Sequence, residues 1–105
     1  MDRIPDKINI IIKRYLRVLE ENKIPIERAY LFGSYANGNY NELSDIDLAL
    51  ISGLFEGVRI QDKNKIREIT LSVSSILEVF PFRPEDFSKS NPFAKEIIET
   101  GIKVA

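Results

Sequence analysis

The residues best suited to chemistry are two aspartates, Asp45 and Asp47, at the start of an otherwise apolar run that ends at Ile51. If this run is a β-strand, residues two apart point to the same side. Both carboxylates then face one way, while Ile46 and Leu48 face the other. Neighbouring carboxylates repel each other unless a cation neutralises them. The spacing therefore predicts a site for a divalent metal ion, and the alternative is a pair of solvated turn residues.

Such a metal ion must be held by oxygen atoms, because the chain contains neither cysteine nor histidine. Oxygen ligands suit Mg²⁺, Ca²⁺ or Mn²⁺. A calcium loop also begins with aspartate-x-aspartate, but Leu48, Ala49 and Leu50 supply no further side-chain oxygens and no glycine for its sharp turn. The calcium-loop interpretation therefore fails.

A phosphate site is predicted upstream, at Gly33 and Ser34. These residues lie where an apolar run over 29–32, expected to be a strand, passes into a short helical turn. The first backbone N–H groups of a helix lack intrahelical partners and attract anions. Glycine lets the backbone approach the ligand, and the Ser34 hydroxyl can donate one more hydrogen bond. With the two aspartates, this turn predicts binding of a metal-bound triphosphate, as nucleotidyl transfer requires.

Glu78 is the candidate for a third carboxylate, which a two-metal site needs. It lies between Leu77 and Val79 in a predicted strand, so its side chain points away from their apolar face. The alternative is a solvent-facing residue on an edge strand, and the residues alone leave both interpretations open.

The remaining patterns predict alternating helices and strands. Apolar residues from Ile8 to Leu19 recur at helical spacing, and Ile10, off this stripe, either widens the buried face or contacts a partner. Asp62 is the expected N-cap of a middle helix, and Pro81 places the last strand at a sheet edge. The expected elements are a helix over 5–22, strands over 29–32, 46–51 and 76–82, and helices over 34–37, 62–75 and 92–100. The order αβαβαβα predicts an α/β (α+β) fold, with 46–51 central in the sheet.

Length and charge narrow the class of protein. The 105 residues suit one domain over 1–105, and 15 basic against 16 acidic residues provide no general attraction for a polyanion. Stable binding of duplex nucleic acid is therefore not expected. The polar start lacks the apolar segment of a signal peptide, and no apolar run could cross a bilayer. We expect a cytoplasmic protein without membrane contact.

The stretch from Leu31 to Ile51 resembles the signature of the DNA polymerase beta nucleotidyltransferase superfamily: glycine-serine, a spacer, then aspartate-x-aspartate. The resemblance is to its minimal nucleotidyltransferases, the MNT proteins, and implies a palm whose small mixed sheet is flanked by helices. It also implies ATP as substrate and one or two Mg²⁺ ions. The residue roles that it implies are nucleotide binding by Gly33, Ser34 and Ser44, and metal binding and catalysis by Asp45, Asp47 and Glu78. Relatives usually carry aspartate at the third position, and many carry an arginine after the glycine-serine pair, where this chain has Tyr35.

The resemblance further implies a partner. MNT proteins often pair with a HEPN toxin and adenylylate one of its tyrosines, so we expect transfer of AMP from ATP to such a hydroxyl, with this chain as the antitoxin. Ile10, Ile102 and Val104 are the expected docking surface, and homo-oligomer formation stays open. One alternative is a binding module that neutralises its partner without catalysis. Another is a nucleotidyltransferase for small molecules, whose known representatives carry a further domain.

Overall fold

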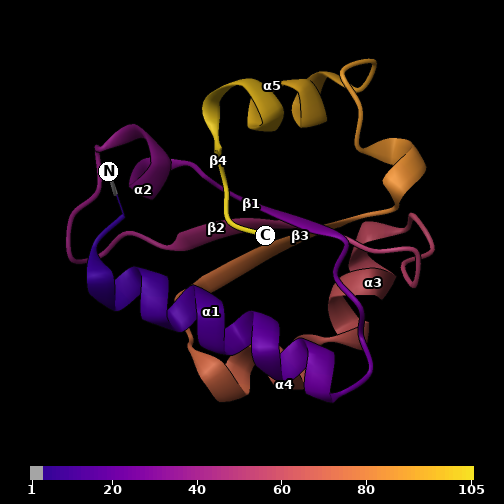
Figure 1. Ribbon diagram of the computed structural model, residues 1–105, viewed down its shortest axis with the longest axis horizontal. Coiled ribbons are helices and arrows are strands. Elements are labelled where there is room, and N and C mark those ends of the chain that lie inside the picture. The colour runs from indigo at the N-terminus through magenta and orange to yellow at the C-terminus, as the bar shows by residue number, and fades with distance from the viewer. Residues whose placement is uncertain (1–3) are drawn as a thin grey trace.

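The computed structural model describes residues 4–105 and contains a four-stranded sheet with helices on both faces (Figure 1). The elements in chain order are α1 (Asp6–Glu21), β1 (Arg28–Phe32), α2 (Ser34–Asn37), β2 (Ile46–Ile51), α3 (Arg59–Lys65), α4 (Arg67–Val73), β3 (Leu77–Phe82), the 3₁₀ helix η1 (Pro84–Asp86), α5 (Pro92–Thr100) and β4 (Ile102–Lys103). The strand order is β3-β2-β1-β4. β1 is antiparallel to β2 and β4, whereas β2 and β3 are parallel. The expected mixed sheet flanked by helices is confirmed.

The alternation of side chains divides the sheet into two faces. Leu48, Leu50 and Val79 point to one face, where α1 and α4 cover them. Ala49 and Phe82 point to the other, where α5 packs on them; Figure 1 shows α5 on the opposite side of the sheet from α1 and α4. β2 lies between two strands and is buried at every position except Asp47, which is partly exposed. The predicted central position of this strand is therefore confirmed, and so is the edge position of β3.

The amphipathic helix α1 anchors the first face. Its residues Ile8, Ile12, Tyr15 and Leu19 are buried, and the Tyr15 hydroxyl lies 2.6 Å from the Thr70 hydroxyl of α4. Ile10 is 65% exposed, so it does not widen the buried face. Its contact with a partner stays a prediction.

The middle helix predicted over 62–75 is wrong in its start and its continuity. The structure has two helices, α3 and α4, which meet at Ile66 in a non-helical conformation. Asp62 is not an N-cap but lies inside α3, where its buried carboxylate accepts the backbone N–H groups of Glu56 and Gly57, each at 2.9 Å. Its short polar side chain caps the preceding loop instead of the helix, because that loop folds back over the first turn of α3.

The end of the chain adds a strand that the sequence did not predict. Residues 102–103 form β4, which pairs with β1, and the Val104 amide donates to the Ala29 carbonyl at 2.9 Å. This pairing covers the outer edge of β1, which would otherwise present unpaired backbone groups. Ile102 and Val104 are partly buried against the core, and their part in a docking surface stays a prediction.

Within residues 4–105, no helix is long and apolar enough to span a membrane. The polar start of the chain, on which the expected lack of a signal peptide depends, includes residues 1–3, which lie outside the described residues.

Candidate active site

The Asp47 carboxylate lies directly against Gly33. β1 ends at Phe32, which is paired with Asp47 across the antiparallel β1–β2 ladder. Gly33 follows with φ +75° and ψ −148°, a conformation that side chains rarely adopt. A Cβ atom at Gly33 would lie 2.2 Å from Asp47 Oδ2, much closer than real Cβ atoms approach any other atom. Both the backbone and the close approach therefore require glycine here.

Asp47 is also in register with Glu78. The parallel β2–β3 pairing sets these two residues side by side, and both alternate with residues of the face covered by helices α1 and α4. They consequently share the face of Phe32 and Phe80. Phe32, Asp47 and Glu78 thus form one row across three neighbouring strands, and Gly33 directly follows Phe32.

Electrostatics distinguish Asp47 from an ordinary surface carboxylate. Its partial burial is the largest cause that raises its pKa above the usual value, and the negative charges of Asp45 and Glu78 raise it further. Asp45 is exposed and directly precedes β2, whose first residue, Ile46, donates its N–H to the Ile76 carbonyl at 2.8 Å. The fold therefore gathers three negative charges, which a bound cation would stabilise.

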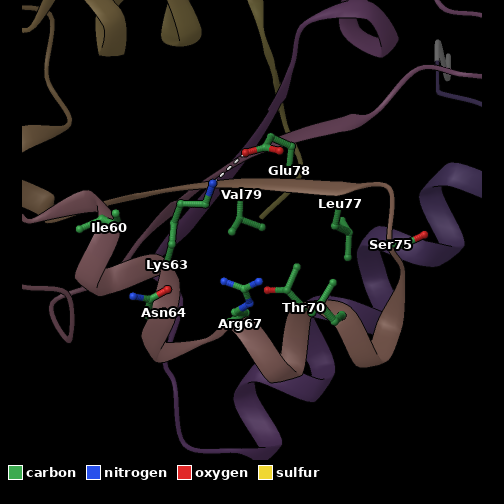
Figure 2. Close-up of a pocket in the computed structure, with 10 residues that line it drawn as sticks. Ile60, Lys63, Asn64, Arg67, Thr70, Ser75, Leu77, Glu78 and Val79 are labelled. Atoms are coloured by element: carbon green, nitrogen blue, oxygen red, sulfur yellow. Dashed lines mark hydrogen bonds and ion pairs between the residues drawn. The ribbon is translucent and has the colours of Figure 1, made fainter.

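Glu78 has a cationic neighbour that the sequence analysis missed. Lys63 Nζ of α3 lies 2.8 Å from Glu78 Oε2. A dashed line marks this ion pair in Figure 2. In the part of the chain that the structure describes, no three acidic residues are arranged to hold a metal ion together. The role of Glu78 as third ligand stays a prediction.

The predicted nucleotide-binding serines differ in their surroundings. Ser34 is partly exposed and begins α2, and the amides of Ala36 and Asn37 both donate to the Gly33 carbonyl. The Ser44 hydroxyl instead accepts the Asn41 amide at 2.9 Å, and so shapes the loop before β2. Ser34 is therefore the better placed of the two to meet a phosphate, while nucleotide binding by either residue stays a prediction.

α3 brings a second cation to this end of the sheet. The Arg59 guanidinium lies over the rings of Phe80, Phe82 and Phe93, 5.3 to 5.8 Å from their centroids. Arg59 and Lys63 are four residues apart on α3 and so lie on the same face of this helix. The spacing of four residues could have predicted from the sequence that Arg59 and Lys63 share one side of a helix. Only the position of α3 next to β3 shows which side chains the two cations contact.

A pocket of about 600 Å³ opens between α3, α4 and β3, next to the Lys63–Glu78 pair (Figure 2). Its polar lining comes from Lys63 and Glu78 of this pair and from Asn64, Arg67, Thr70 and Ser75, and its apolar lining includes Ile60, Leu71, Leu77 and Val79. Figure 2 shows Leu77 and Val79 pointing to the opposite side of β3 from Glu78. The pocket therefore lies on the Leu77 and Val79 side of β3, although Glu78 is also among its lining residues.

Comparison with known proteins identifies the family. The model of the family described as Polymerase beta, Nucleotidyltransferase matches residues 12–105. The chain belongs to this family. A search of the curated proteins gave no significant match.

Two solved structures share the fold of this nucleotidyltransferase domain. One is a Sulfolobus solfataricus protein assigned as a nucleotidyltransferase, with a TM-score of 0.63, 16% identity, and coverage of 92% of this chain and 78% of the other. The second is a crystal structure of a toxin–antitoxin with AMP-PNP, with a TM-score of 0.62, 20% identity, and coverage of 92% of this chain and 72% of the other. At these identities the likeness extends to the fold alone.

The residues present fit a hard divalent cation. Carboxylate oxygens are the ligands that Mg²⁺ prefers, and Asp47 is drawn in against Gly33, where any Cβ atom would displace it. Asp45 and Asp47 could hold the ion between them, with Gly33 and Ser34 on the side of β1 where a phosphate could approach.

Proposed function

We propose that this domain is a Mg²⁺-dependent nucleotidyltransferase that moves AMP from ATP to a hydroxyl group. The observation that carries the proposal is that Asp47 lies against Gly33 and is in register with Glu78. Its carboxylate is thus between a glycine-serine turn suited to phosphate and a second carboxylate suited to accepting a proton. Membership of the polymerase beta nucleotidyltransferase family supports the reaction class.

The residues would divide the work as follows. Backbone N–H groups at Gly33 and Ser34, with the Ser34 hydroxyl, bind the terminal phosphates of ATP. Asp45 and Asp47 hold Mg²⁺, which when bound neutralises charge on the phosphate oxygens. The acceptor oxygen forms a bond to the α-phosphorus while the bond from that phosphorus to the pyrophosphate oxygen breaks. Pyrophosphate leaves, and Glu78, which would also be the third carboxylate at the metal, takes the proton of the acceptor hydroxyl.

The acceptor that we propose is a tyrosine of a HEPN toxin, so that this chain acts as its antitoxin in the cytoplasm. Support comes from the resemblance of the segment 31–51 to MNT proteins and from the shared fold with a toxin–antitoxin structure that contains AMP-PNP. The exposed Ile10 on α1 is one surface residue available for such a partner.

An assay of label transfer tests the reaction. The purified protein is incubated with ATP labelled at the α-phosphate, Mg²⁺ and the product of the neighbouring gene. We expect label on that protein, lost in Asp47→Asn and in Asp45→Asn. Asp6→Asn, an exposed aspartate at the start of α1, is the control and should transfer label normally. Undiminished transfer by the double variant Asp45→Ala, Asp47→Ala would refute the assigned site.

The second candidate function is neutralisation of the partner by binding alone. The Lys63–Glu78 ion pair favours this function, because Lys63 binds the carboxylate that catalysis would need as its third acidic group. If the double alanine variant protects cells from the partner as well as the native protein does, binding is sufficient. Turnover of a small hydroxyl compound without a protein partner would instead support the small-molecule enzyme.

A further inference from the structure

The Lys63–Glu78 ion pair stands at the point where the proposed reaction needs a free carboxylate. Its two charged atoms are 2.8 Å apart, and both side chains are only partly exposed, at 39% and 42%. Glu78 is in register with Asp47 on the neighbouring strand, so the ammonium lies at the end of the acidic row. A carboxylate oxygen in contact with an ammonium cannot offer the same lone pairs to a metal ion, and the two cations repel each other.

We propose that Lys63 is a positioning residue that neutralises Glu78 in the metal-free protein and releases it when the metal site fills. This inference rests on the proposed function, because it gives Glu78 the part of third carboxylate. It accounts for the contact of Lys63 with a carboxylate that is in register with Asp47, in a protein where no group of three acidic residues among residues 4–105 is arranged as ligands. Lys63 removes part of the repulsion that the row would otherwise carry.

The partial exposure of Lys63 lets its ammonium leave the carboxylate. Lys63 and Glu78 both line the pocket, together with Asn64, Thr70, Ser75 and the positively charged Arg67 (Figure 2), so the ammonium would turn to solvent and not deeper into the pocket. A lysine ammonium is strongly hydrated and ends a flexible four-carbon stem, and at 39% exposure it already reaches water. An arginine fixed by two parallel hydrogen bonds would be a poorer switch.

A second ion pair on the same helix provides a matched control. Lys65 Nζ lies 3.1 Å from Glu56 Oε2, and its side-chain exposure of 34% is close to the 39% of Lys63. Lys65 does not line the pocket and Glu56 is not in the acidic row. Loss of the Lys65 charge therefore tests the general effect of removing a lysine from α3.

Mn²⁺ binding to the intact protein, followed by the electron paramagnetic resonance signal of free Mn²⁺, tests the inference without catalysis. Lys63→Met should tighten Mn²⁺ binding by about two- to tenfold, the size expected for a partly exposed charge next to the site. Lys63→Arg keeps the positive charge and the ion pair, so it should not tighten binding, and Lys65→Met should behave like the native protein. Glu78→Gln should weaken binding more in the Lys63→Met background than in the native one, because in the native protein the contact of Glu78 with the metal is gained only at the cost of its ion pair with Lys63.

The results separate failure of this inference from failure of the proposed function. If Asp47→Asn abolishes Mn²⁺ binding but Lys63→Met behaves like Lys65→Met, the proposed site stands and the role of Lys63 is refuted. An equal effect of Glu78→Gln in both backgrounds also refutes it, because Lys63 then acts by charge alone. If Asp47→Asn leaves Mn²⁺ binding unchanged, the metal binds elsewhere and the proposed function fails with the inference. Matching thermal unfolding curves show that each variant is folded.

Discussion

Gly33→Ala should change the position of the Asp47 carboxylate in the candidate site, and its effect on function can be distinguished from its effect on the stability of the fold. Gly33 has a positive φ, and its missing Cβ leaves the space that the Asp47 carboxylate occupies. An added methyl group would lie 2.2 Å from Asp47 Oδ2, whereas ordinary contacts are at least about 1 Å longer. In the variant the Asp47 carboxylate must therefore move away from residue 33 by about 1 Å.

The expected magnitudes follow from these two effects. The backbone conformation costs a residue with a side chain about 1–3 kcal/mol in the free energy of unfolding. A shift of about 1 Å in a group that positions the reaction lowers the rate about 100-fold. Gly38→Ala is the matched control, because Gly38 also has a positive φ, +81°, but nothing lies within 4 Å of the place where its Cβ would be. Gly38→Ala should lose about 1–2 kcal/mol and keep its activity.

Three measurements on each variant complete the test. Urea unfolding gives the stability, and the binding of a fluorescent ATP analogue in the presence of Mg²⁺, together with label transfer, gives the function. We expect Gly33→Ala and Gly38→Ala to be similar in stability and very different in nucleotide binding and transfer. If Gly33→Ala binds and transfers the nucleotide as well as Gly38→Ala does, the contact between Gly33 and Asp47 has no part in the site.

Three further substitutions have predictable effects on stability. Asp47→Asn should stabilise the metal-free protein at neutral pH. Burial first, and then the two neighbouring carboxylates, raise the folded-state pKa of Asp47 above its unfolded value, so the ionised form costs stability above the folded pKa. This gain should disappear as pH falls through the folded pKa to below the unfolded one; urea unfolding at several pH values measures it, and a constant gain would contradict the assigned cause. Asp62→Ala should cost about 1–3 kcal/mol in chemical unfolding, because two loop amides lose their buried acceptor; no loss would show that water replaces it. Tyr15→Phe should cost about 1 kcal/mol by the same measurement, since Thr70 keeps its bond to a helix carbonyl; a much larger loss would mean that the Tyr15 hydroxyl also orders α4.

Features that depend on local periodicity could be predicted from the sequence. The alternation in 46–51 correctly separates Asp47 from Leu48, and the same rule separates Glu78 from its apolar neighbours. The last helix has the bounds expected from Pro92 and Gly101, and its N-cap, Asn91, accepts the Phe93 amide at 3.0 Å. These features could be predicted because they depend only on the order of residues within one helix or strand and on the side of that element to which each residue points.

Features that depend on how elements cross in space could not be predicted. The break at Ile66 contains no glycine or proline, and β4 has only two residues, too few for a pattern to appear. Asp62 has the residue type of an N-cap, and only the position of the preceding loop shows that it caps this loop instead. The Lys63–Glu78 pair likewise requires the path of α3 beside β3.

The parallel pairing of β2 with β3 makes the candidate site a property of the complete fold. The two strands are joined through α3 and α4, so Asp47 meets Glu78 only after this long crossover has closed. A partly folded chain would therefore lack the candidate site, and a nucleotide that binds there would bind only the native state. By mass action such a ligand adds to the free energy of unfolding. A cell rich in that nucleotide would thus keep more of the protein folded and beyond the reach of proteases.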